Sequence, residues 1–224
     1  MSKVRLRTTE VLDALSHMGR NDEYGMHQAV WSLFSDTEER ARDFVYRRLD
    51  DQGPFAFLTV SERVPEDPHG WWDIDTKPYA PALAAGDRLA FSLLANPVRT
   101  GRNKEGKHAR FDVVMEAKLH DRTLPPDQRR PQAVLEQEAG VAWLASRADT
   151  LGLDVDKATL RVGGYRVHEF FKRGGGRAKP IRFATLEFSG VGTVTSIAAL
   201  HLALRNGVGP AKGFGCGLLL VRRA

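Results

Sequence analysis

Residues 196–221 have the sequence SIAALHLALRNGVGPAKGFGCGLLLV, which joins an apolar helical pattern to a short apolar run through a loop rich in glycine. Residues 196–205 carry apolar side chains at helical spacing, and Asn206-Gly207 is a typical helix C-cap. Residues 218–221 are typical of a buried strand. The stretch therefore predicts a helix, a glycine-rich loop and a strand, in that order.

The glycine-rich loop could bind phosphate groups. Its glycines are Gly207, Gly209, Gly213, Gly215 and Gly217. Glycine permits positive φ and lets a phosphate approach backbone N–H groups, while Lys212 adds one positive charge. A P-loop or a dinucleotide-binding turn leaves a strand and opens a helix, so the reversed order here excludes a Walker A site. Two interpretations remain, a tightly packed connection or a surface that lies along a polyphosphate backbone.

The amino-acid composition limits the classes of protein to which this chain can belong. The 224 residues allow one large domain or two small ones, and the 42% hydrophobic content is enough for real cores. The single cysteine, Cys216, excludes an internal disulfide and a cysteine-based zinc cluster. The first ten residues, MSKVRLRTTE, contain no apolar signal region, and the apolar runs are too short to span a bilayer. We therefore expect a cytoplasmic protein.

Two halves of the chain predict the same order of elements. The first half is expected to contain a strand at 3–8, a helix from 26 through the segment TEERARD, strands at 44–49 and 54–63, a short helix within 71–83, and a strand at 87–95. The second half is expected to contain a strand at 110–119, a helix within 130–152, strands at 160–172 and 178–188, a helix at 196–205 and a strand at 218–221.

Each half is thus β-α-β-β-α-β, the order of a ferredoxin-like domain with an antiparallel sheet, which RNA-recognition motifs also use. The sequence predicts an α+β protein with two such domains in tandem. Residues 1–97 would form the N-terminal domain, residues 98–109 a basic linker, and residues 110–224 the C-terminal domain.

The net charge of +5 is concentrated in basic clusters, which favours nucleic acid as the partner. The linker cluster consists of Arg99, Arg102, Lys104, Lys107 and Arg110. A predicted hairpin with a triple-glycine tip carries Lys172, Arg173, Arg177, Lys179 and Arg182. A basic ribbon of this kind can track phosphates or enter a groove, although a solvated linker and hairpin remain the alternative. We expect both clusters, together with Lys212, to bind RNA.

Tyr24 and His27 are the candidates for chemistry. They are three residues apart, so they share a face of the predicted helix, and an imidazole can transfer protons at cellular pH. If the substrate is RNA, its own 2′-hydroxyl can attack the adjacent phosphate, which needs a base, an acid and positive charge but no metal. The other histidines show no paired metal-ligand spacing, so we expect neither a metal site nor a cofactor. Ordinary packing of the Tyr/His pair is the alternative.

Three segments together resemble one known family. Tyr24-Gly25-Met26-His27, Asn96-Pro97 with the basic segment that ends near Lys107, and GVGPAKGFGCGLLLV at residues 207–221 resemble CasE, the CRISPR repeat-RNA endoribonuclease family of type I-E systems. The resemblance covers nearly the whole chain, and the C-terminal stretch is its most specific part. At Gln28 and Pro210 the chain lacks basic residues that many relatives have.

The resemblance implies a metal-independent endoribonuclease that binds the repeat stem-loop and cleaves at the 3′ base of the stem. The products would be a 2′,3′-cyclic phosphate and a 5′-hydroxyl, and the protein would stay on the guide RNA within a surveillance complex. His27 would be the general acid or base, and Tyr24 its partner. A non-catalytic RNA-binding subunit is the alternative function. A nucleotide-using transferase would require a Mg²⁺ site that the sequence does not show.

Overall fold

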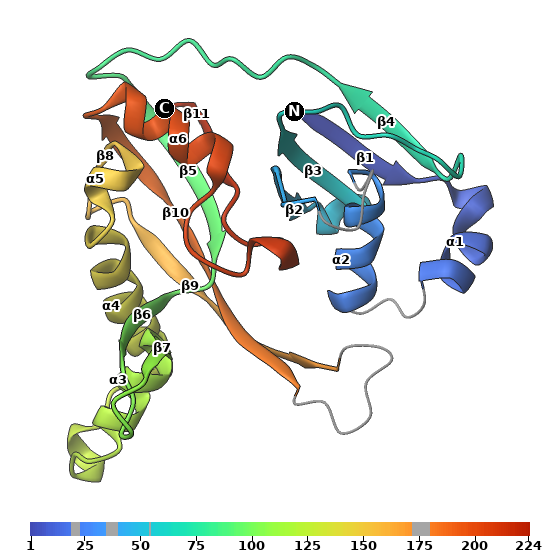
Figure 1. Ribbon diagram of the computed structural model, residues 1–224. Helices are drawn as coiled ribbons and strands as arrows, with labels where there is room; N and C mark the ends of the chain where they lie inside the picture. Colours follow the sequence, from blue (N-terminus) through green and yellow to red (C-terminus); the bar gives the residue numbers. More distant parts are fainter. Residues whose placement is uncertain (19–22, 35–39, 54, 172–179) are drawn as a thin grey trace.

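The structure is a computed structural model that describes residues 1–18, 23–34, 40–53, 55–171 and 180–224. Its elements form two antiparallel sheets that stand side by side, each covered by helices (Figure 1). No helix in these ranges is both long and apolar enough to span a membrane.

The first sheet has the strand order β2-β3-β1-β4. Its strands are β1 (Ser2–Leu6), β2 (Phe44–Arg48), β3 (Ala56–Ser61) and β4 (Trp72–Thr76). The helices α1 (Val11–Met18) and α2 (Glu23–Ser32) cover one face, with short 3-10 turns at Thr8–Glu10 and Asp50–Gln52. Val4, Phe57 and Trp72 from the sheet bury their side chains against Met26 and Val30 of α2, which makes this helix part of the first core.

The second sheet has the strand order β11-β5-β10-β8, and β9 pairs with the remaining length of β10. Its strands are β5 (Arg88–Ala95), β8 (Leu153–Val155), β9 (Arg161–Phe170), β10 (Ile181–Val194) and β11 (Leu219–Arg223). The helices around it are α3 (Val113–Asp121), α4 (Gln132–Ala145), α5 (Ala148–Leu151) and α6 (Ile197–Asn206), with 3-10 turns at Pro126–Gln128 and Lys212–Phe214 (η4).

The first sheet places its strands in the order fourth, first, third, second along the chain, and β11, β5, β10 and β9 repeat this order in the second sheet, where the short β8 is an additional fifth strand beside β10. The predicted α+β class with tandem ferredoxin-like units is therefore confirmed. In the first unit, however, no helix lies between β3 and β4 in the described residues. Residues 72–76, expected within a segment with a short helix, pair along β1 instead, with Ile74 opposite Val4.

The strand at residues 87–95 was predicted to close the first sheet, and this assignment is wrong. Residues 88–95 form β5, which lies between β10 and β11 in the second sheet. Leu89, Phe91 and Leu93, at every other position of β5, bury their side chains in the second core. Such alternation shows which face of a strand is apolar but not which sheet the strand joins. We now propose that the boundary between the two units lies between Thr76 and Arg88 rather than at residue 97.

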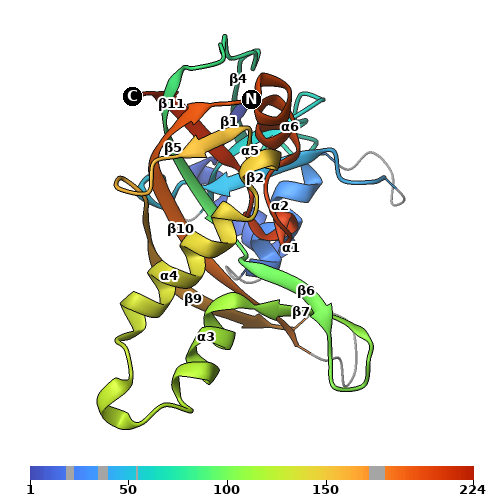
Figure 2. The same ribbon diagram turned by 90° about the vertical axis from the view of Figure 1, so that its left-hand side faces the viewer.

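The predicted basic linker is a structured hairpin. Its strands β6 (Val98–Arg102) and β7 (His108–Asp112) form a separate two-stranded sheet that projects beside α3 (Figure 2). The strand expected at 110–119 ends at Asp112, because the Asp112 carboxylate caps α3 by accepting bonds from the backbone N–H groups of Val114 and Met115 at 2.9 and 3.0 Å.

The helix expected to run from residue 26 through the segment TEERARD also ends earlier. α2 stops at Ser32, and tight turns follow in which the N–H groups of Leu33 and Phe34 donate to Val30 and Trp31. These turns bring the Phe34 ring onto Phe44, with the ring centroids 4.3 Å apart. Phe34 and Phe44 thereby both join the first core.

Candidate nucleic-acid interface

Helix α2 presents Tyr24 and His27 on one face, as their spacing predicted. Their ring centroids lie 6.2 Å apart, and both side chains are half-buried. Rings from several other elements surround the pair. Phe214 of η4 lies 5.2 Å from His27, and Phe170 of β9 lies 6.4 Å from Tyr24, measured between centroids. The two residues thus lie where the first unit meets the second.

The backbone carbonyl of Gly213 fixes the orientation of the His27 ring. His27 Nδ1 lies 2.6 Å from this oxygen, and because a carbonyl only accepts, Nδ1 must carry the proton. The neutral ring then has its lone pair on Nε2, which makes Nε2 the atom that can take up a proton. The Tyr46 hydroxyl donates to the same oxygen at 2.9 Å.

Because Gly213 has no side chain, the loop backbone can lie close to His27 and Arg42. A Cβ at this position would lie 3.3 Å from His27 Cε1 and 3.3 Å from Arg42 Nη1, so even alanine would press on both side chains. Four other loop glycines, Gly207, Gly209, Gly215 and Gly217, have positive φ. The sequence left two interpretations of the glycine loop, a packed connection or a surface along a polyphosphate backbone, and the structure adds that the loop bonds to the His27 ring.

A depression of ≈ 550 Å³ opens beside His27. It is lined by Tyr24 and His27, by the cations Arg42, Arg110 and Lys212, and by the loop residues Gly209, Pro210, Ala211, Gly213 and Phe214. No carboxylate is among these residues, so the depression is positively charged. Its size and charge fit a phosphate with its adjoining sugars.

Arg42 is the residue of this site that the sequence did not reveal. It lies in a segment expected to continue α2, fifteen positions from His27, but α2 ends at Ser32 and Arg42 lines the depression together with the loop. Burial lowers the pKa of Arg42, and burial together with the charge of Arg42 lowers the pKa of Lys212. Within the described part of the chain neither cation forms an ion pair. An anion between them would relieve this repulsion.

Three of the five cations in the predicted basic cluster on β6–β7 bond to neighbouring protein groups. Arg99 forms a two-point ion pair with Glu116 of α3 and stacks over Phe111, so its charge is partly neutralised. Arg102 donates to the Gly106 carbonyl at 2.8 Å, and Lys107 pairs with Glu105 at 3.3 Å.

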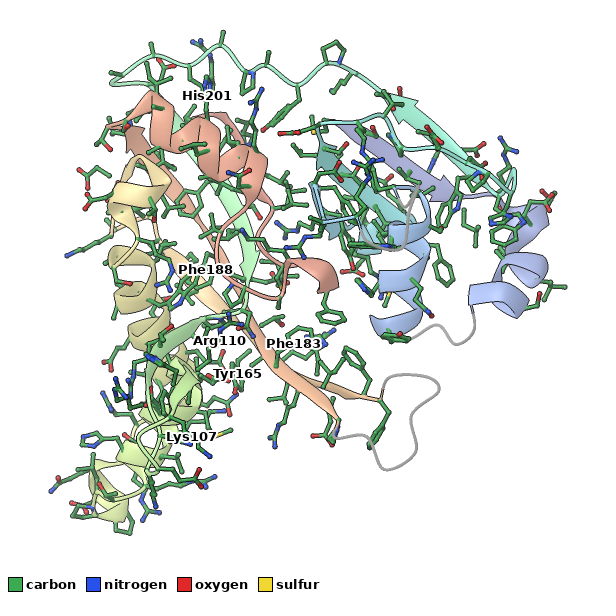
Figure 3. All side chains as sticks on the ribbon, viewed as in Figure 1. Lys107, Arg110, Tyr165, Phe183, Phe188 and His201 are labelled. Atoms are coloured by element: carbon green, nitrogen blue, oxygen red, sulfur yellow. The ribbon has the colours of Figure 1, made fainter. Side chains whose placement is uncertain are left out.

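Lys104 is exposed, and Arg110 lines the depression beside His27. Figure 3 shows Lys107 and Arg110 on this hairpin, with Arg110 nearer to the β9–β10 ribbon.

The β9–β10 ribbon extends past the edge of the second sheet toward α2 (Figure 1). Arg182 lies exposed on it, 3.7 Å from Glu169. The other predicted RNA-binding residues of this hairpin, Lys172, Arg173, Arg177 and Lys179, lie outside the described residues. Arg110 lines the depression from the β6–β7 hairpin, and Phe170 of the ribbon lies beside Tyr24, so both hairpins adjoin the depression.

The chain is similar to known proteins in both sequence and fold. A family model described as CRISPR associated protein matches residues 1–223. The Cascade subunit CasE of Escherichia coli is 29% identical over 203 residues, which cover 88% of this chain and 90% of that protein. The CRISPR-associated endoribonuclease Cse3 of Thermus thermophilus is 28% identical over 230 residues, with 96% and 98% covered. A structure of Cse3 endoribonuclease bound to a 19-nucleotide RNA has a similar fold, with a TM-score of 0.67 at 23% identity over 99% of this chain and 98% of that one.

Proposed function

Because the chain belongs to the CasE family of CRISPR associated proteins, we propose that it is an endoribonuclease that processes the CRISPR precursor transcript. It binds the stem-loop of the repeat and cleaves at the 3′ base of the stem. Its relatives include a Cascade subunit, so we extend the proposal to assembly: the protein stays on the mature guide RNA within a type I-E surveillance complex.

The proposal assigns the reaction to the 2′-hydroxyl of the nucleotide before the scissile bond. A base removes the hydroxyl proton, the 2′-oxygen bonds to phosphorus, and the 5′-oxygen leaves with a proton from an acid. The products are a 2′,3′-cyclic phosphate and a 5′-hydroxyl. In this proposal no step needs a metal.

His27 and Tyr24 are the proposed acid–base pair. The observation that carries this assignment is the 2.6 Å bond from His27 Nδ1 to the Gly213 carbonyl, which leaves Nε2 for proton transfer in a depression free of carboxylates. Arg42, Arg110 and Lys212 line the same depression and would stabilise the extra negative charge of the phosphorane. The ribbon and the β6–β7 hairpin would hold the stem.

Incubation with repeat RNA in EDTA tests the proposal. We expect cleavage at one site to continue, with a product that carries a 2′,3′-cyclic phosphate. A repeat with a 2′-deoxy nucleotide before the scissile phosphate should bind and stay whole. Intact ribose RNA both with and without EDTA would instead indicate a non-catalytic binding subunit, and cleavage of the 2′-deoxy RNA would indicate water as the nucleophile.

A further inference from the structure

A second and larger cavity, of ≈ 960 Å³, lies between the first sheet and the end of α6. Its walls come from the start of β1, the edges of β2 and β3, the segment 76–79, and residues 205–206 at the end of α6. Arg42 and Lys212 also line it. These two cations thus border both this groove and the depression beside His27, so the two cavities adjoin at Arg42 and Lys212.

Cations predominate in the groove. Arg63 donates two hydrogen bonds to Asp43, at 2.6 and 3.1 Å, and these bonds hold the pKa of Asp43 below its ordinary value, so this pair is internally neutral. The charges that remain on the walls are those of Arg42, Lys77, Arg205 and Lys212, against Glu62 alone. Lys77 and Arg205 are exposed, the first in the segment 76–79 and the second at the end of α6. Such a groove attracts a polyanion.

One aromatic ring of the groove can stack on a base. Tyr79 is half-buried between the second core and the small cluster of Val45, Val60 and Leu218, and burial raises its pKa, so its ring is anchored and uncharged. Exposed Val64 and Pro78 lie on the same walls. A basic groove with an aromatic platform is the arrangement by which proteins hold single-stranded nucleic acid without reading its sequence.

We infer that this groove binds the single-stranded RNA that continues beyond the scissile phosphate on its 3′ side. The inference rests on the proposed function, because it takes the stem to lie on the ribbon and the scissile phosphate at His27. A strand that leaves the stem past His27 meets Arg42 and Lys212 next and then enters the groove. The groove contacts phosphates and stacks on a base without reading the sequence. This suits the RNA beyond the scissile phosphate, whose sequence is variable.

Binding of two non-cleavable repeats tests the inference. Both carry a 2′-deoxy nucleotide before the scissile phosphate; one has a single nucleotide beyond it, and the other has about eight, within the range of site sizes known for single-strand grooves. We expect the long RNA to bind about tenfold more tightly than the short one. The slope of log K against log salt concentration should be steeper by about 0.7 for each additional phosphate neutralised. The Lys77→Glu/Arg205→Glu variant should reduce this ratio to about 1.

The matched control is Lys157→Glu/Arg222→Glu, which makes the same charge change at exposed positions that line neither cavity and should keep the wild-type ratio. An independent measurement places 4-thiouridine in the extension, which we expect to crosslink to residues 76–79 or 205–206 of the wild-type protein. This second measurement does not depend on the folding of a variant.

Three results would overturn the inference: equal affinity of the wild type for both RNAs, an unchanged ratio in the Lys77/Arg205 variant, or loss in that variant of binding to a protein subunit while the ratio persists. The last would make the groove a protein-docking site. If the proposed nuclease function is wrong, these experiments give a different result. A wild type that prefers the long RNA but leaves the all-ribose repeat intact would support the groove and refute the nuclease.

Discussion

At the scale of single residues, one carbonyl oxygen organises the candidate site. The Gly213 oxygen accepts from the His27 ring and from the Tyr46 hydroxyl, so a loop of the second unit sets the tautomer of a side chain on the first. The side chains around this oxygen are aromatic or cationic. The catalytic roles of Tyr24 and His27 stay predictions that single substitutions can test.

His27→Ala removes the proposed proton-transfer group. We expect the single-turnover cleavage rate to fall by at least about 100-fold, since general acid–base catalysis contributes 10²–10⁴-fold, while the affinity for non-cleavable repeat RNA changes little. The matched control is His201→Ala, which removes an exposed imidazole on α6 (Figure 3) that lines neither cavity. A cleavage rate equal to that of the control would contradict the assignment.

Tyr46→Phe removes the second donor to the Gly213 oxygen. The hydroxyl is buried, and burial raises its pKa above the ordinary value, so it is a protonated donor at neutral pH. We expect the free energy of unfolding, measured with urea, to fall by about 1 kcal/mol. Tyr79→Phe, which removes a hydroxyl with no described hydrogen bond, should change it less. Equal changes would show that the bond does not stabilise the loop.

Cys216 should be inert in the folded protein. The side chain is fully buried, and burial raises the pKa of its thiol to about 12. A raised pKa means less thiolate, so at about pH 9 only about one thousandth of the thiol is ionised. We expect iodoacetamide to label Cys216 only after unfolding, measured by mass spectrometry. Labelling of the native protein at the rate of the denatured one would show that this part of the loop opens.

At the scale of elements, the glycine loop between α6 and β11 owes its shape to backbone contacts that side chains would prevent. Gly207 and Gly217 have φ of 70° and 93°, and the Val208 N–H donates to the Gly217 carbonyl at 2.8 Å. Gly209 packs against the Trp143 ring. These contacts tie the loop to the second core and so hold Gly213 at a fixed distance from α2.

Gly217→Ala tests this description of the loop. Its Cβ would lie 2.8 Å from the Val208 carbonyl oxygen, and its φ is one that L-residues rarely adopt. We expect the free energy of unfolding to fall by about 1–3 kcal/mol, as for other residues held at strained backbone angles. In the control Gly163→Ala the added methyl meets no atom within 4 Å and the φ is not positive. If both variants unfold at the same urea concentration, the loop is less constrained than described.

At the scale of the whole molecule, the site exists because two units are joined along a small apolar seam. Val45 and Val60 of the first sheet bury against Leu218, which follows the glycine loop. Arg47 of β2 donates to the Ser92 hydroxyl of β5 at 2.7 Å, and α6 contacts β2 and β3. His27 and Gly213 lie on opposite sides of this seam, so their distance depends on it.

Leu218→Ala should weaken the seam. Leu218 is buried, and its truncation is expected to cost about 2–5 kcal/mol and to uncouple the unfolding of the two units. We therefore expect the urea transitions followed by tryptophan fluorescence and by circular dichroism to separate. Leu93→Ala, an equal deletion inside the second core, should lower the midpoint with both signals still coincident. Coincident transitions in Leu218→Ala would mean that other contacts couple the units.

Much of this molecule could be predicted from local patterns. Alternation and helical spacing located β1, β2, β3, α4 and α6, and the repeated order of elements predicted the tandem ferredoxin-like plan. The spacing of Tyr24 and His27 predicted their shared face, because three residues are nearly one helical turn. The segments that resembled CasE pointed to the family that the comparison of the whole chain then showed.

Tertiary structure alone decided three other features. It placed β5 in the second sheet, ended α2 early so that Arg42 returns to the loop, and brought the Gly213 carbonyl to His27 across 186 positions. Periodicity states which face of an element is apolar but not which neighbour covers it. The sequence by itself therefore determined the elements and the candidate residues, and the packing of the two units determined which of them meet.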